Sequence, residues 1–126
     1  MEGSMYKTLE VNAIQATSII GSRVRNQDSE NVGKIEDFVI DMETGRIAYA
    51  VLSFGGFLGM GDKLFAVPFQ SMQFDVEDEE FVLNVNIERL KNAPGFDPNH
   101  WPKMGEREWG SKIHAYYGQK PYWVDE

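Results

Sequence analysis

Apolar and polar residues of this chain alternate in short runs between turn-forming residues, a pattern typical of strands rather than of long helices. Gly33–Met42 is a strand candidate whose apolar residues change parity, and a bulge near Asp37 would restore one buried face. Arg46–Phe54 is apolar on both faces, which is typical of a central strand. The intervening Glu43-Thr44-Gly45 predicts a tight turn with Gly45 at positive φ. The two segments make the strongest predicted hairpin.

The remaining strands and helices are expected to be short. Strands are predicted at Arg23–Arg25, at Lys63–Phe69 with Pro68 at an edge or a strand end, and in a hairpin of Gln73–Val76 with Glu80–Asn86. Short helices are predicted within Asn12–Ile20, before Gly21, and at Ile87–Ala93, before Pro94. Five or six strands at this spacing predict a mainly β protein, a small antiparallel barrel over residues 17–90 whose closure removes exposed edges.

From Pro94 onward the composition changes. This segment holds four of the five prolines and all three tryptophans. Glu106–Tyr117 can form one amphipathic helix with Trp109, Ile113 and Tyr116 or Tyr117 on one face. Such an aromatic load has to pack on something, either the barrel of the same chain or a neighbouring subunit. The chain is therefore divided into an N-terminal extension (1–16), a barrel domain (17–93) and an aromatic, proline-containing C-terminal extension (94–126).

Charge and cysteine content narrow the function classes. Twelve basic against 20 acidic residues give a net charge of −8, which opposes nucleic acid and anionic lipid, and Arg23 and Arg25 stand as an isolated basic pair. There is no cysteine, so disulfides, thiolate catalysis and cysteine-based metal sites are excluded. The longest uncharged run, Ile47–Gly61, is too short and too glycine-rich to span a membrane as a helix. A cytoplasmic location is expected, without membrane insertion.

The glycine-rich segment Gly55–Gly61 is predicted to be a structural hairpin rather than a phosphate-binding loop. A phosphate-binding loop has its lysine directly after the last glycine and a helix next, whereas here Asp62 intervenes and a strand follows. The segment also carries Phe57, Leu58 and Met60. These apolar side chains either fold back over one end of the barrel or contact a partner.

No motif indicates catalysis or a metal. His100 and His114 are the only histidines and match no ligand spacing, so a structural or surface role is expected for each, with His114 on a helix surface beside Tyr117. The consecutive carboxylates Glu77–Glu80 suit a solvated turn, and Asp37 and Asp41 suit hydrogen bonding to turn amides. We expect no enzyme activity, no cofactor and no bound metal.

Several segments in order resemble the PRC-barrel family. They are IIGSRVRNQDSENVGKIEDFVID, METGRIAYAVLSFGGFLGMGDKLFAVPF and IERLKNAPGFD, which together cover about residues 17–98. The resemblance implies a small barrel that acts as an interaction scaffold, with no catalytic residues to carry over. The family includes barrels of the photosynthetic reaction centre H subunit and of ribosome maturation factors, and this chain looks like a stand-alone member.

The leading functional hypothesis is a non-catalytic interaction module that forms a homo-oligomer, with a dimer favoured, and that binds other proteins. The alternative is a barrel that binds a small apolar ligand, and a weaker alternative is an RNA- or ribosome-associated factor. The predicted contact residues are apolar or aromatic: Phe57, Leu58, Met60, Trp101, Trp109, Tyr116 and Tyr117.

Overall fold

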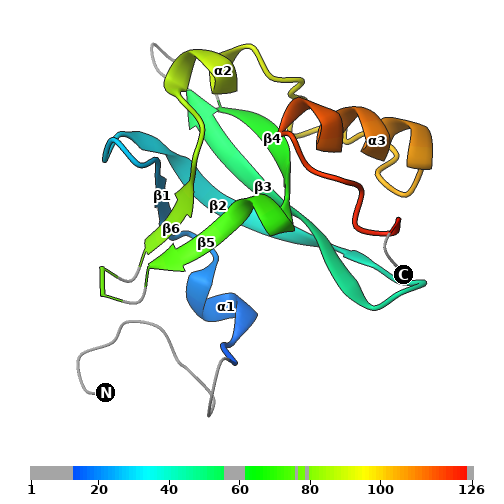
Figure 1. Cartoon of the computed structure of the whole chain (residues 1–126), viewed down its shortest axis with the longest axis horizontal. Coiled ribbons are helices and arrows are strands. Elements are labelled where there is room, and N and C mark those ends of the chain that lie inside the picture. Colours follow the sequence, from blue (N-terminus) through cyan, green and yellow to red (C-terminus); the bar gives the residue numbers. More distant parts are fainter. Residues whose placement is uncertain (1–12, 56–61, 76, 79, 125–126) are drawn as a thin grey trace.

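The computed structural model describes residues 13–55, 62–75, 77–78 and 80–124. These residues form one curled six-stranded sheet in the order β4-β3-β2-β1-β6-β5, with short helices around it (Figure 1). The strands are β1 (Arg23–Arg25), β2 (Asn31–Asp41), β3 (Arg46–Gly55), β4 (Asp62–Pro68), β5 (Met72–Asp75) and β6 (Glu80–Leu83). The helices are α1 (Ala16–Ile19), the 3-10 turn η1 (Phe69–Ser71), α2 (Ile87–Lys91) and α3 (Arg107–Tyr116). The predicted mainly β fold is confirmed.

One strand pair departs from the expected antiparallel arrangement. β1 and β6 run parallel, with Val24 opposite Phe81 and Arg25 opposite Val82. Hairpins force only consecutive strands to be antiparallel, and β1 and β6 are far apart in the chain, so nothing local fixes their direction. Among the described strands no ladder joins β4 to β5, so the sheet is curled but not closed by hydrogen bonds.

The β2–β3 hairpin forms as predicted. Its register shifts twice, between Ile35 and Asp37 and between Val39 and Ile40, so the predicted bulge near Asp37 is confirmed. In the turn, the Asp41 carboxylate accepts hydrogen bonds from the amides of Glu43 and Thr44, and Gly45 has a φ of 77°. A side chain at that φ would be strained, which is why the turn uses glycine.

The concave face of the sheet encloses the main core. Val24, Ile35, Leu52 and Phe65 from four strands pack there, and Leu90 of α2 packs against them. The convex face is covered by the segment after residue 94. α3 places Ile113 against Ala48, Tyr49 and Ala66, together with Tyr122. The predicted helix at 106–117 is confirmed, and its aromatic face packs on the barrel of the same chain. From Ala48 to Ser53 β3 is buried on both faces, in agreement with its apolar sequence.

The segment after residue 94 also protects an edge of the sheet. β4 is an edge strand, and Leu64 exchanges two backbone hydrogen bonds with Phe96, at 3.0 and 2.8 Å. This bridge satisfies backbone groups that closure of the barrel was expected to satisfy, and it blunts an edge on which another chain could add a strand.

Candidate interaction surface

The distal half of the β2–β3 hairpin extends beyond its neighbours in the sheet. β4 pairs with β3 only as far as Tyr49, and the ladder between β1 and β2 ends at Lys34. Residues 40–47, which we call the ribbon, therefore have only each other as ladder partners among the described strands: Ile40 pairs with Ile47 and Asp41 with Arg46. In Figure 1 the ribbon projects from the body of the molecule toward the side where the C-terminus lies.

One face of the ribbon is apolar, and no described part of the chain covers it. Ile40 and Ile47 are cross-strand partners, 55% and 41% exposed, and Met42 in the adjoining turn is 88% exposed. Near the base of this face Phe38 contacts the Phe69 ring of η1 edge-on, with centroids 5.9 Å apart, whereas Ile40 and Ile47 remain exposed. Of the six large apolar side chains that are exposed in the described residues, three lie here. Exposed apolar side chains that cluster on one projection are typical of a contact surface.

The opposite face of the ribbon is held by the C-terminal segment. The Tyr122 hydroxyl donates a hydrogen bond of 2.5 Å to the Asp41 carboxylate, and Nη1 of Arg46 donates one of 2.6 Å to the Tyr122 carbonyl. Nη1 of Arg107 lies 3.6 Å from Oδ2 of Asp41. The hydrogen bond from Tyr122 is the main cause that lowers the pKa of Asp41. Since neighbours in a strand point to opposite faces, fixing Asp41 and Arg46 fixes the outward direction of Ile40 and Ile47.

A buried aromatic cluster lies where α3 meets β3. The Tyr49 ring contacts the rings of Trp109, His114 and Tyr122, with centroids 5.3, 5.5 and 6.4 Å apart. α3 can approach this closely because residue 110 is glycine: a Cβ there would lie 2.6 Å from the Tyr49 hydroxyl oxygen. The cluster therefore fixes the C-terminal segment on the barrel.

His114 is fully buried in that cluster, and its predicted position on the helix surface is wrong. Its Nδ1 lies 2.7 Å from the Gly110 carbonyl oxygen, to which it donates as the Nδ1-protonated neutral tautomer. Burial lowers the pKa of His114. The rings of Tyr122 and Trp123 cover His114. These two residues belong to a segment without regular periodicity, so the helical pattern of the sequence could not indicate that His114 is buried.

The four predicted contact residues that the structure describes do not form one exposed surface. Trp109 packs on Tyr49, while Tyr116 and Tyr117 are partly buried and pack against the main core. Trp101 is exposed, and its ring lies against Phe96. Phe57, Leu58 and Met60 lie outside the described residues, as does most of the glycine-rich segment. Its flanks do pair as a hairpin, with Gly55 opposite Asp62, and a strand follows it as expected.

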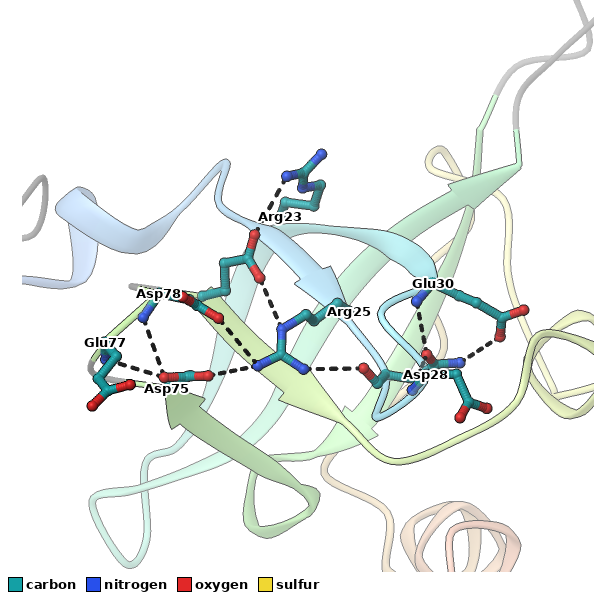
Figure 2. Close-up of polar contacts among 9 residues, drawn as sticks. Arg23, Arg25, Asp28, Glu30, Asp75, Glu77 and Asp78 are labelled. Carbon is teal, nitrogen blue, oxygen red and sulfur yellow. Dashed lines mark hydrogen bonds and ion pairs between the residues drawn. The ribbon is translucent and has the colours of Figure 1, made fainter.

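Sequence reasoning missed a charged cluster on the other side of the sheet, which Figure 2 shows. The Arg25 guanidinium donates to Glu80 at 2.9 Å and to Asp75 at 2.6 Å, and it lies 3.7 Å from Asp78. Arg25 is therefore not isolated, and the acidic turn is not merely solvated. The pairing depends on the long-range contact between β1 and β6, for which the sequence carries no local signal. The carboxylates of this cluster are already paired with the Arg25 guanidinium. We therefore assign the cluster a structural role, in which it holds β1 against β6 and β5.

A groove of about 490 Å³ lies between the turn after β1, the segment leading into α2 and the end of α3. Its lining is mostly polar: Asn26, Gln27, Asp28, Asn84, Val85, Asn86, Arg89, Tyr116, Tyr117 and Gly118. Within the described ranges no three histidine, aspartate or glutamate side chains are placed to hold a metal ion together. No helix in the described part of the chain is long and apolar enough to cross a membrane.

Comparison with known families matches residues 11–90 to the PRC-barrel domain, more than half of the 126 residues. The chain belongs to the PRC-barrel family. The matched region contains all six strands and most of α2, so in this PRC barrel the covering helix α3 lies outside the family match. A comparison with curated proteins finds no match.

Proposed function

We propose that this PRC barrel is a non-catalytic interaction module that self-associates through the uncovered face of its ribbon. The observation that carries the proposal is the exposure of Ile40, Met42 and Ile47 on one projecting hairpin. Each side chain is roughly half exposed or more, so covering it recovers about 1 kcal/mol. A second copy of this chain carries the same apolar patch, and a two-fold interface brings two identical patches together. We therefore propose that a second copy covers the ribbon.

The bracing of the ribbon supports this proposal. Association costs less when the contact surface is already held in its bound conformation. Tyr122 and Arg107 hold the ribbon from behind through Asp41, and Arg46 adds a bond to the Tyr122 carbonyl. These contacts all lie on the opposite face of the ribbon, so they fix the hairpin without using its apolar face. Six side chains, three from each copy, predict a weak dimer with a Kd in about the micromolar to millimolar range.

Charge sets the expected salt dependence. Two copies of a chain with a net charge of −8 repel one another, and salt screens that repulsion. We therefore expect the dimer to tighten as ionic strength rises. A contact held by ion pairs with a basic partner would weaken instead, so the salt dependence separates self-association from binding to a basic protein.

Light scattering coupled to size-exclusion chromatography over a concentration series tests the proposal. The double variant Ile40→Thr/Ile47→Thr should weaken the dimer by at least about tenfold. Ile20→Thr is the matched control because Ile20 is 41% exposed, like Ile47, but lies at the end of α1. Monomeric wild-type protein at millimolar concentration, or equal losses in the variant and the control, would contradict the proposal.

A further inference from the structure

The groove beside α2 and the end of α3 is separate from the ribbon, and its lining suits a small polar ligand. Three segments that are distant in sequence build it, around residues 26–28, 84–89 and 116–118. Its volume of about 490 Å³ is within the range of small-molecule sites. Only one of its ten lining residues, Val85, has an aliphatic side chain, so an apolar ligand would leave amide and charged groups unsatisfied.

The walls of the groove are held by internal hydrogen bonds. The Asn26 side chain is buried and bonded on both sides: it accepts from the amides of Asp28 and Glu30 and donates to the Val85 carbonyl. Asn86 caps α2 by accepting a hydrogen bond from the Arg89 amide. The groove is therefore formed before any ligand arrives, which reduces the cost of binding.

Arg89 and Tyr116 form a second rigid wall. The guanidinium lies over the Tyr116 ring, 4.1 Å from its centroid, and Nη2 donates to the Tyr116 carbonyl at 2.7 Å. In return the Tyr116 hydroxyl donates to the Arg89 carbonyl. Among the described residues only Nη2 of the guanidinium donates a hydrogen bond, so most of its five N–H donors remain available to an acceptor.

The charges of the lining are balanced. Asp28 and Arg89 are its two ionised side chains, one acidic and one basic, and neither forms an ion pair with another described residue. The remaining polar groups are neutral amides and tyrosine hydroxyls. The Tyr117 hydroxyl is buried and has no hydrogen-bond partner among the described residues.

We propose that this groove binds a small zwitterion, of the size of an amino acid or a dipeptide. Its carboxylate is held by Arg89 and its ammonium by Asp28, and the side-chain amides of Asn84 and Asn86 are among the other lining groups. A simple anion would face Asp28 and the overall negative charge, and a simple cation would face Arg89. A molecule carrying both charges satisfies both residues.

Isothermal titration of the full chain with glycine, β-alanine, γ-aminobutyric acid and diglycine tests the proposal, because these probes separate the two charges by increasing distances. At least one should bind, and both its N-acetyl and its methyl ester derivatives should bind about tenfold more weakly, since each lacks one charge. Equal binding of the derivatives, or no binding by any of the four, would overturn the proposal.

Two variants locate the site without depending on those derivatives. Asp28→Asn should reduce the affinity about tenfold, and Glu88→Gln, an exposed acid on α2 outside the lining, should leave it unchanged. Arg89→Gln should reduce it similarly, and Lys91→Gln is its control. An unchanged affinity in Asp28→Asn, with intact thermal unfolding, would contradict this assignment. None of these outcomes bears on self-association through the ribbon.

Discussion

Gly110→Ala tests whether α3 is packed on the barrel of its own chain. In a free helix this change stabilises, because alanine is favoured over glycine by about 1 kcal/mol. In this structure the new methyl group would lie 2.6 Å from the Tyr49 hydroxyl oxygen and 2.8 Å from the Trp123 ring, well inside ordinary contact. Tyr49 is almost fully buried on the central strand β3, so it has little room to move.

The steric cost is expected in the upper half of the usual range for overpacking, at about 2–3 kcal/mol. After subtraction of the gain in helix propensity, we expect a net loss of about 1–2 kcal/mol, or a Tm lower by about 3–8 °C. Thermal unfolding followed by circular dichroism measures it. Gly105→Ala is the control, since nothing lies within 4 Å of a Cβ there. A Gly110→Ala protein that is more stable than wild type would refute the packing of α3 on Tyr49.

Three further predictions concern the polar contacts. Burial lowers the pKa of His114, so this side chain binds a proton more readily in the unfolded chain than in the folded one. The free energy of unfolding should therefore fall as the pH drops below about 6.5. Urea unfolding at several pH values measures this dependence, and His114→Gln should remove the part due to His114. Tyr122→Phe should cost about 1–2 kcal/mol at pH 7, and the loss should shrink as the pH falls and Asp41, whose pKa is lowered in the folded state, becomes protonated. Arg25→Met should lower the Tm by a few degrees and Arg23→Met, at a far more exposed site, by much less; equal shifts would contradict the role of the charged cluster.

Local features of the fold could be predicted from the sequence because local residues determine them. Gly45 fixes the tight turn, and the parity change around Asp37 marks the bulge. Both features depend on residues within one hairpin. The helix α3 also follows from the spacing of Trp109 and Ile113.

Long-range pairing could not be predicted in the same way. The parallel contact of β1 with β6 and the carboxylates that it brings to Arg25 depend on how the sheet curls. The ribbon surface was missed for a related reason. Ile40 and Ile47 follow the pattern of buried strand residues, and the sequence does not show that the ladders of β1 and β4 end before reaching them.

Self-association through the ribbon is tested most directly by the δ1-methyl signals of isoleucine, followed by NMR as the protein is diluted. The account predicts that the signals of Ile40 and Ile47 shift together along one monomer–dimer curve while that of Ile20 stays in place. Signals that do not depend on concentration, or shifts at Ile20 and not at the ribbon, would contradict it.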